Sequence, residues 1–240
     1  MVETKKQEEP LSEVKAGKIL EAVYEKALNG IPMVSRSVNE IANDYLSHHD
    51  TPKAAARSLA RWQVAKCGTS GFLSGLGGIV TLPVTVPANV GSVMYVQMRM
   101  IAAIAKMGGY DVNSDQVQTL VYMCLTGTTI ADIVKETGIQ IGTKSLIAAI
   151  KKIPGTVLMK INQKIGFRFL TKFGEKGAIN LCKLVPIAGG LIGGGVDVAS
   201  TVVISRNAIR IFIEDETSNM PEPSAEKIHT AEDITIEATD

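Results

Sequence analysis

The chain of 240 residues is long enough to bury one sizeable core, and it is 45% apolar and 20% charged. Its mean hydropathy of +0.17 is high for a soluble protein and favours contact with a membrane. The formal charge of +1 conceals an asymmetry, because residues 214–240 hold nine acids and one lysine, a net of −8, which leaves +9 for the rest. Three isolated cysteines without a C-x-x-C motif argue against a disulfide framework and indicate a reducing compartment.

The first third of the chain predicts three helices after a polar start. No apolar run occurs in MVETKKQEEPLSEV, so no signal peptide is expected and the protein should act from inside the cell. Ser12 can cap a helix over 12–29, and a second helix is expected over 38–48. Thr51 and Pro52 begin a third helix that ends at Gly68, because threonine caps a helix and proline fits its first turn.

Two apolar stretches rich in glycine and proline dominate the remainder. GFLSGLGGIVTLPVTVPAN occupies 71–89 and LVPIAGGLIGGGVD occupies 184–197, and an apolar helix pattern follows each, over 90–106 and 198–213. Such stretches suit either a tightly packed helical interior or a hairpin that dips into lipid. The glycines expected at close contacts are Gly71, Gly75, Gly77, Gly78, Gly189, Gly190, Gly193, Gly194 and Gly195.

The helices that follow these stretches carry polar residues in informative places. Asn89 and Asp197 hold matching positions and predict N-caps, with a polar point lining a shared cavity as the alternative. The pattern over 88–106 is nearly long enough to cross a membrane, but it carries Gln97 and Arg99 near its middle. A central arginine costs about 2.5 to 3.5 kcal/mol on insertion, so a re-entrant or protein-covered helix is expected instead.

The other helices complete an all-α pattern. A turn over 108–111 precedes a helix over 114–126 that Ser114 caps, and further helices are expected to about 136, over 143–153 and over 156–176. No strand pattern competes. The predicted fold is therefore a compact, all-α, multi-helix and membrane-associated domain over 11–213 that contains the two Gly/Pro-rich apolar hairpin units. Residues 1–10 and the acidic tail 214–240 are predicted to be disordered.

Basic side chains recur every four residues on two predicted helices, so each set winds slowly around its helix. The candidate membrane or anion contacts are Lys53, Arg57 and Arg61 on one helix and Lys160, Lys164, Arg168, Lys172 and Lys176 on the other. Each set can be a simple solvated face. Few acids balance the second set, and it lies between the two apolar stretches, which favours anionic membrane lipids as its partner. Nucleic acid is not expected, because no basic platform with interleaved aromatic residues is visible.

The residue patterns that support catalysis are missing from the sequence. Val80 stands where a dinucleotide loop after Gly75 and Gly77 needs a third glycine, and Gly142-Thr143-Lys144-Ser145 lacks the upstream glycine of a phosphate loop. Three histidines give no metal spacing and no catalytic triad pattern. We therefore expect no enzyme activity, no cofactor and no metal.

Three segments in order, GLGGIVTLPVTVPANV, MRMIAAIAKMGGYD and LVPIAGGLIGGGVDVASTVVISRNAIRIF, resemble the EcsC family over about Ser58 to Phe212. EcsC-like proteins occur in bacteria, in some cases encoded beside an ABC transporter, and their biochemical activity is not established. The resemblance implies a helical, membrane-associated accessory protein and supplies no catalytic residues. A weaker likeness of layout exists to the membrane-proximal helical regions attached to some GTPases.

The sequence thus predicts a non-enzymatic accessory protein of the EcsC type. It would act at the cytoplasmic face of a membrane, peripherally or shallowly inserted, and support an ABC transporter or another membrane process. Two alternatives stay open. One is a membrane-perturbing effector of the pore-forming or toxin type, and the other is a soluble enzyme or lipid-binding module with a Gly-lined apolar pocket.

Overall fold

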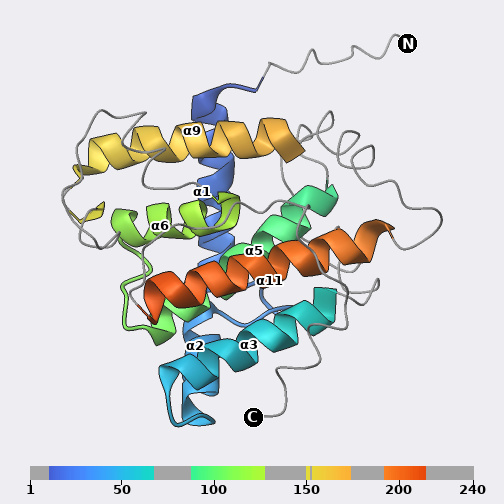
Figure 1. Cartoon of the computed structure of the whole chain (residues 1–240). Helices are drawn as coiled ribbons and strands as arrows, with labels where there is room; N and C mark the ends of the chain where they lie inside the picture. Colours follow the sequence, from blue (N-terminus) through green and yellow to red (C-terminus); the bar gives the residue numbers. More distant parts are fainter. Residues whose placement is uncertain (1–10, 68–87, 128–149, 152, 174–191, 215–240) are drawn as a thin grey trace.

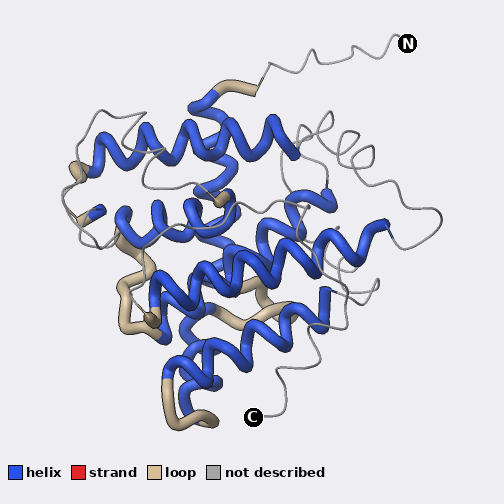
Figure 2. Tube along the Cα trace, in the orientation of Figure 1, coloured by secondary structure: helices blue, strands red, loops and turns tan. Residues whose placement is uncertain are grey.

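The computed structural model describes residues 11–67, 88–127, 150–151, 153–173 and 192–214, and the all-α prediction is confirmed for them. The helices are α1 (Glu13–Asn29), α2 (Val38–Ser47), α3 (Pro52–Cys67), α5 (Ala88–Met107), α6 (Asp115–Thr126), α9 (Gly155–Phe173) and α11 (Ile192–Phe212). In this part of the chain the backbone forms no strand, and an isolated bridge joins Ile31 to Ser35 (Figure 2).

Helix α5 lies at the centre of the described structure. It contacts α1, α2, α3, α6 and α11, and its side chains from Met94 to Ala105 are buried almost without exception. Figure 1 shows α9 and α6 above α5 and α11, with α3 and α2 below, while α1 runs behind the others and across them. A helix that is apolar on all sides needs such a complete cover, because it has no face to expose to water.

Local sequence signals set the helix starts. The Ser12 hydroxyl accepts a hydrogen bond of 3.2 Å from the Lys15 backbone amide, and Ser37 forms a capping box with Glu40 at the start of α2. Ser114 caps α6, and the Thr51 hydroxyl accepts from the Ala54 amide at 3.2 Å. These caps were expected for Ser12, Thr51 and Ser114, and each satisfies one backbone donor that the first helical turn leaves without an intrahelical partner.

Helix α1 shows how local pattern becomes packing. Its apolar residues recur every three or four positions and make one buried stripe: Ala16, Ile19, Leu20, Val23, Tyr24 and Ala27. This stripe faces α5 and α9. Each large apolar side chain buried in this way contributes about 1.5 to 3 kcal/mol, so the stripe accounts for the position of α1 although its ends are polar.

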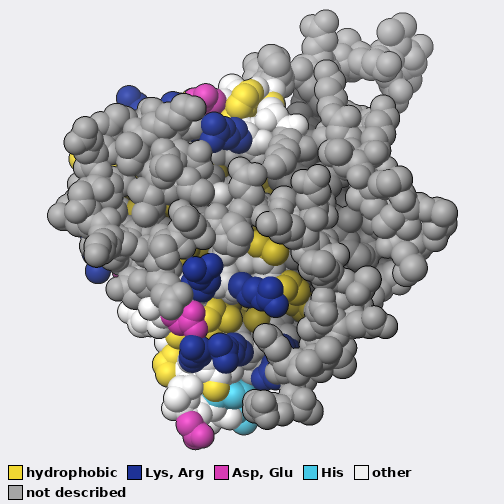
Figure 3. Space-filling view, viewed as in Figure 1, with side chains coloured by type: hydrophobic (Ala, Val, Ile, Leu, Met, Phe, Trp, Pro, Cys, Tyr) yellow, Lys and Arg dark blue, Asp and Glu magenta, His cyan; other side chains and the backbone are white. Residues whose placement is uncertain are grey.

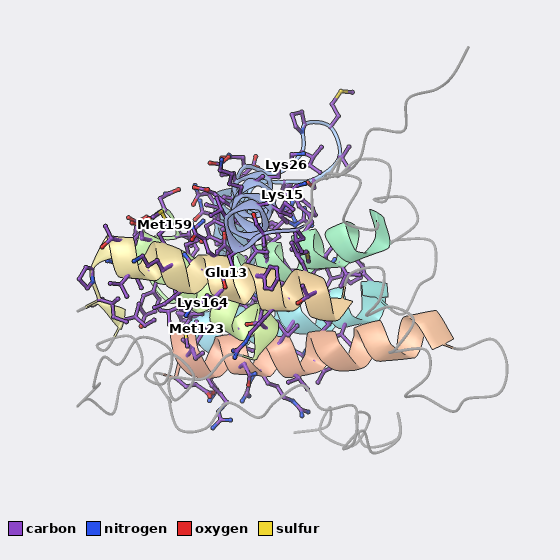
Figure 4. All side chains as sticks on the ribbon, turned by 90° about the horizontal axis from the view of Figure 1, so that it is seen from above. Glu13, Lys15, Lys26, Met123, Met159 and Lys164 are labelled. Atoms are coloured by element: carbon purple, nitrogen blue, oxygen red, sulfur yellow. The ribbon has the colours of Figure 1, made fainter. Side chains whose placement is uncertain are left out.

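Glycines allow two close approaches between elements. A Cβ atom on Gly108 would lie 2.1 Å from the carbonyl oxygen of Phe212, so the end of α5 sits directly against the end of α11. A Cβ on Gly166 of α9 would lie 3.0 Å from the Ala16 carbonyl oxygen, and one on Gly17 would lie 2.8 Å from Cγ of Gln163. Figure 4 shows α9 lying across α1 at this contact.

The structure bears on two expectations for the long apolar helices. None of the described helices combines the length and the hydropathy needed to cross a membrane. Protein covers helix α5, and Gln97 and Arg99 are both buried. This matches the protein-covered helix, one of the two alternatives that the sequence left open. The residues of the two expected hairpins that precede Ala88 and Ile192 lie outside the described part, as do 1–10 and 215–240.

The expected cap positions differ from the observed helix starts. Asn89 is the second residue of α5, and Asp197 is the sixth residue of α11, so neither occupies the N-cap of its described helix. Helix α11 runs through Gly193, Gly194 and Gly195. Each glycine costs about 1 kcal/mol relative to alanine in a helix, but propensity is a weak preference that tertiary packing overrides, and α11 packs on both α3 and α5.

Candidate functional site

A cavity of about 190 Å³ lies among α2, α3, α5 and the segment that leads into α2. Its apolar walls come from Ile41, Leu59 and neighbouring side chains. Its polar lining consists of Ser35, Arg36, Tyr45, Gln63, Lys66, Tyr95 and Arg99. Helix packing creates this arrangement, because α2 and α3 both pack on α5 and on each other. We refer to it below as the Arg99 cavity.

Arg99 is the most unusual group in the cavity. It sits in the middle of the apolar helix α5 and is only 8% exposed. The guanidinium carbon lies 5.4 Å from the centre of the Tyr95 ring, within the range of a cation–π contact. Its Nε and Nη1 atoms are buried and have no hydrogen-bond partner in the described structure. A buried cation without hydrogen-bonded counter-groups is costly, so this geometry favours an anion within reach of the guanidinium.

Other polar groups of the lining are fixed around Arg99. The hydroxyls of Ser35 and Tyr95 share a hydrogen bond that ties the segment before α2 to α5. Ser35 also accepts a hydrogen bond of 2.9 Å from the Ile31 backbone amide. The Gln63 side chain is buried, and its Oε1 atom has no partner among the described residues. The cavity therefore places hydroxyl groups beside the guanidinium, together with the Gln63 amide oxygen, which is an acceptor.

All of the charged side chains in the lining are cations. Burial lowers the pKa of the Lys66 ammonium, and the positive charges of Arg99 and Arg36 lower it further. The lining contains three cations and, among its described residues, no acid. Asp44 lies outside this lining and pairs with Arg36 at 2.9 Å. The remaining repulsion between Lys66 and Arg99 would be relieved by an anion bound between them.

Exposed apolar side chains surround the opening of the cavity. Val34 and Trp62 belong to the lining, yet Trp62 is 54% exposed and Val34 is 48% exposed. Met33, next to Val34, is fully exposed and has a φ of 62°, which is unusual for a residue with a side chain. Two backbone hydrogen bonds between Ile31 and Ser35 hold this short loop. We call Met33, Val34 and Trp62 the apolar rim.

The predicted basic residues of α3 are on the surface. Lys53, Arg57 and Arg61 are all exposed, and α3 packs beside α11, which adds the exposed Arg206. Figure 3 shows Lys and Arg side chains gathered on the face that α3 and α11 form. Lys53 pairs with Glu214 at 2.6 Å. We call Lys53, Arg57, Arg61 and Arg206 the basic face.

The second predicted basic set follows α9 only in part. Lys160 and Arg168 are exposed and Lys164 is half-buried, with Lys164 marked on α9 in Figure 4. Lys172 lies in the last turn of α9, and Lys176 lies outside the described residues. The regular four-residue spacing therefore does not place all of these side chains in equal contact with solvent.

Most of the predicted close-packing glycines lie outside the described residues, namely Gly71, Gly75, Gly77, Gly78, Gly189 and Gly190. Among the described residues, the close approaches that an added Cβ atom would disturb involve Gly17, Gly30, Gly108 and Gly166.

Sequence reasoning did not identify the Arg99 cavity as a site. It noted Arg99 only as an obstacle to membrane insertion, and it did not select Ser35, Gln63, Lys66 or Tyr95. The available signal was the charge itself, an arginine near the middle of a helix that is mostly apolar. Comparisons with known protein families, with characterised proteins and with solved structures found no match for this chain.

Proposed function

We propose that this protein is a non-enzymatic accessory protein of the EcsC type that attaches peripherally to the cytoplasmic face of an anionic membrane. The observation that carries the proposal is the basic face, where two packed helices expose Lys53, Arg57, Arg61 and Arg206 together. Cytoplasmic leaflets carry a negative surface potential, and each nearby lysine or arginine contributes about 1 kcal/mol of attraction. The EcsC resemblance supports an ABC transporter or another membrane protein as the partner in this setting.

A comparison of two matched double variants tests the attachment surface. Arg57→Gln with Arg61→Gln removes two charges from the basic face, and Lys160→Gln with Arg168→Gln removes two from α9. Sedimentation with vesicles of phosphatidylcholine and phosphatidylglycerol measures the affinity of each. The α3 pair should lower the affinity roughly 10- to 30-fold, as expected for about 2 kcal/mol, and the binding that remains should depend less on salt.

The α9 pair should have a smaller effect. If only the α9 pair weakens binding, the attachment surface is α9 and not the basic face. If the unmodified protein does not sediment with anionic vesicles at low salt, peripheral attachment by charge is wrong.

A further inference from the structure

We propose that the acidic C-terminal segment of this same chain, residues 215–240, docks on the basic face and competes there with an anionic membrane. The inference rests on the proposed membrane attachment and assigns to its surface a partner within the chain. Below, residues 215–240 are called the acidic segment.

The acidic segment starts beside the basic face. Helices α3 and α11 lie side by side and run in opposite directions, so the end of α11 meets the start of α3 (Figure 1). At this point the Glu214 carboxylate and the Lys53 ammonium form an ion pair of 2.6 Å. Glu214 directly precedes the acidic segment, and Lys53 is the first cation of the basic face. A contact of the proposed kind is therefore already made at the point where the segment begins.

The other cations of the basic face lack counter-charges in the described part of the chain. Arg57, Arg61 and Arg206 are exposed, and none of them forms an ion pair with a described acid. The sequence of α3 contains no acid at all, and that of α11 contains one, Asp197, near its start. A group of like charges without local compensation attracts an anionic partner.

The acidic segment supplies the opposite charge. It contains eight acids and one lysine, a net charge of −7, and it is joined directly to Glu214. A segment of this charge is complementary to three uncompensated arginines. Charge is therefore the physical basis of the proposed contact.

The distances allow the contact. A helix rises about 1.5 Å per residue, so Arg61 lies about 12 Å along α3 from Lys53, and Arg206 lies about 12 Å along the chain direction of α11 from Glu214. An extended chain spans about 3.3 to 3.6 Å per residue, so about four residues cover this distance. Glu222 lies eight residues beyond Glu214. The segment can thus bring carboxylates to the arginines without any movement of α3 or α11.

Tethering makes a weak contact effective. Exposed ion pairs are individually weak, and salt screens them. A segment joined to its docking surface has an effective concentration in the millimolar range, so several such pairs can form together. An anionic membrane presents a much larger array of negative charge and can displace the segment. The basic face would then bind strongly anionic membranes and discriminate against weakly charged surfaces.

The test compares two variants of the full chain that lose the same number of acids. The segment variant carries Glu222→Gln, Glu226→Gln and Glu232→Gln. The α1 variant carries Glu13→Gln, Glu21→Gln and Glu25→Gln, at exposed positions of a helix that packs mainly on α5 and α9. The two variants therefore have identical net charge and differ only in where the acids were removed.

The first readout is affinity for vesicles of phosphatidylcholine and phosphatidylglycerol at low salt. The segment variant should bind about tenfold more tightly than the unmodified protein, as expected when one or two arginines become available to the membrane. The α1 variant should change the affinity less than about twofold. When Arg57→Gln and Arg61→Gln are also present, the gain of the segment variant should largely disappear, because the contested cations are gone.

The second readout needs no membrane. The side-chain Nε–H resonances of Arg57, Arg61 and Arg206 should differ between the unmodified protein and the segment variant, and salt should reduce the difference. The buried Arg99 serves as an internal reference, and its resonance should not move. The difference should persist on about tenfold dilution, because a tethered segment needs no second molecule.

Three results would overturn the inference. The first is an equal gain in vesicle affinity for the two variants, which would mean that the acids act through net charge alone. The second is identical arginine resonances in the unmodified protein and the segment variant. The third is a resonance difference that disappears on dilution, which would assign the contact to a second copy of the chain.

The two readouts also separate this inference from the proposed function. If neither the unmodified protein nor the segment variant sediments with anionic vesicles while the arginine resonances still differ, the membrane attachment is wrong and the docking of the acidic segment is supported.

Discussion

The Tyr24 hydroxyl donates a hydrogen bond of 2.8 Å to the backbone carbonyl of Val112, 88 residues further along the chain. The same ring meets Tyr122 of α6 edge to face, with ring centres 5.7 Å apart. Both phenols are buried, and the contact joins α1 to the turn before α6 and to α6 itself. A buried phenol can donate this hydrogen bond only while it keeps its proton, so the contact links the stability of the fold to pH.

We expect the protein to lose stability in alkaline solution. Burial raises the pKa of Tyr24 and of Tyr122 well above the ordinary value of 10.0, and it also raises the pKa of the Cys124 thiol. Because the unfolded chain releases these protons at lower pH than the folded protein does, their stabilising effect is complete below the unfolded pKa values. It declines as the pH rises above about 9 to 10, by up to about 1.4 kcal/mol per pH unit for each group.

Urea unfolding at a series of pH values from 8 upward measures this decline. Tyr122→Phe removes one titrating group and should make the decline less steep. A free energy of unfolding that is constant from pH 8 to beyond pH 10.5 would contradict the expectation.

A pair of adjacent glycines separates steric from conformational effects. Gly108→Ala would place a Cβ atom 2.1 Å from the Phe212 carbonyl oxygen, so the ends of α5 and α11 must move apart. Gly109→Ala meets no atom within 4 Å, but it puts a side chain at a φ of 85°. We expect Gly109→Ala to cost about 1 to 2 kcal/mol and Gly108→Ala to cost more, because it adds overpacking against backbone. Thermal unfolding of both variants checks the order, and a milder effect of Gly108→Ala would show that the contact between the two helix ends is loose.

The crossing of α1 and α9 makes the effect of Gly17→Ala on stability depend on the side chain at position 163. Alanine favours a helix over glycine by about 1 kcal/mol, but the Cβ atom of Gly17→Ala would lie 2.8 Å from Cγ of Gln163. Gly17→Ala alone should therefore destabilise the protein. In a Gln163→Ala background, where Cγ is gone and the nearest remaining atom is the backbone Cα of residue 163 at 3.3 Å, the same change should cost less. A double-mutant cycle from chemical denaturation measures this coupling. Additive effects of the two substitutions would mean that the helices can separate slightly without cost.

The hydrogen bond between Ser35 and Tyr95 should contribute to the stability of the fold. Tyr95→Phe keeps the ring beneath Arg99 and removes only the hydroxyl, so we expect a loss of about 0.5 to 1.5 kcal/mol in unfolding free energy. Tyr45→Phe changes another tyrosine of the lining and serves as the control for stability, measured by urea unfolding. Full stability in Tyr95→Phe would show that the loop that carries Met33 and Val34 is held by its own backbone hydrogen bonds alone.

The sequence by itself determined the local structure of the described part. Serine and threonine caps and apolar residues at helical spacing are signals between residues a few positions apart. They placed α1, α2, α3 and α6 within a residue or two. Reasoning from local signals was less successful at α11. Its glycines were interpreted as a break, but they lie within the helix, because contacts with α3 and α5 outweigh the low helix propensity of glycine. The sequence also placed Arg99 in a mostly apolar helix, and it left open whether that helix is re-entrant or covered by protein.

Only the tertiary structure decided what covers Arg99. Ser35 comes from a loop, Gln63 and Lys66 come from α3, and Tyr95 lies one turn before Arg99 on α5. Their convergence depends on how α2 and α3 settle on α5, which is set by the fit of side chains that are far apart in sequence. Periodicity says which face of each helix is buried, but it does not say which buried faces meet. For this reason the cationic cavity and the apolar residues at its opening became visible only when the helices were packed together.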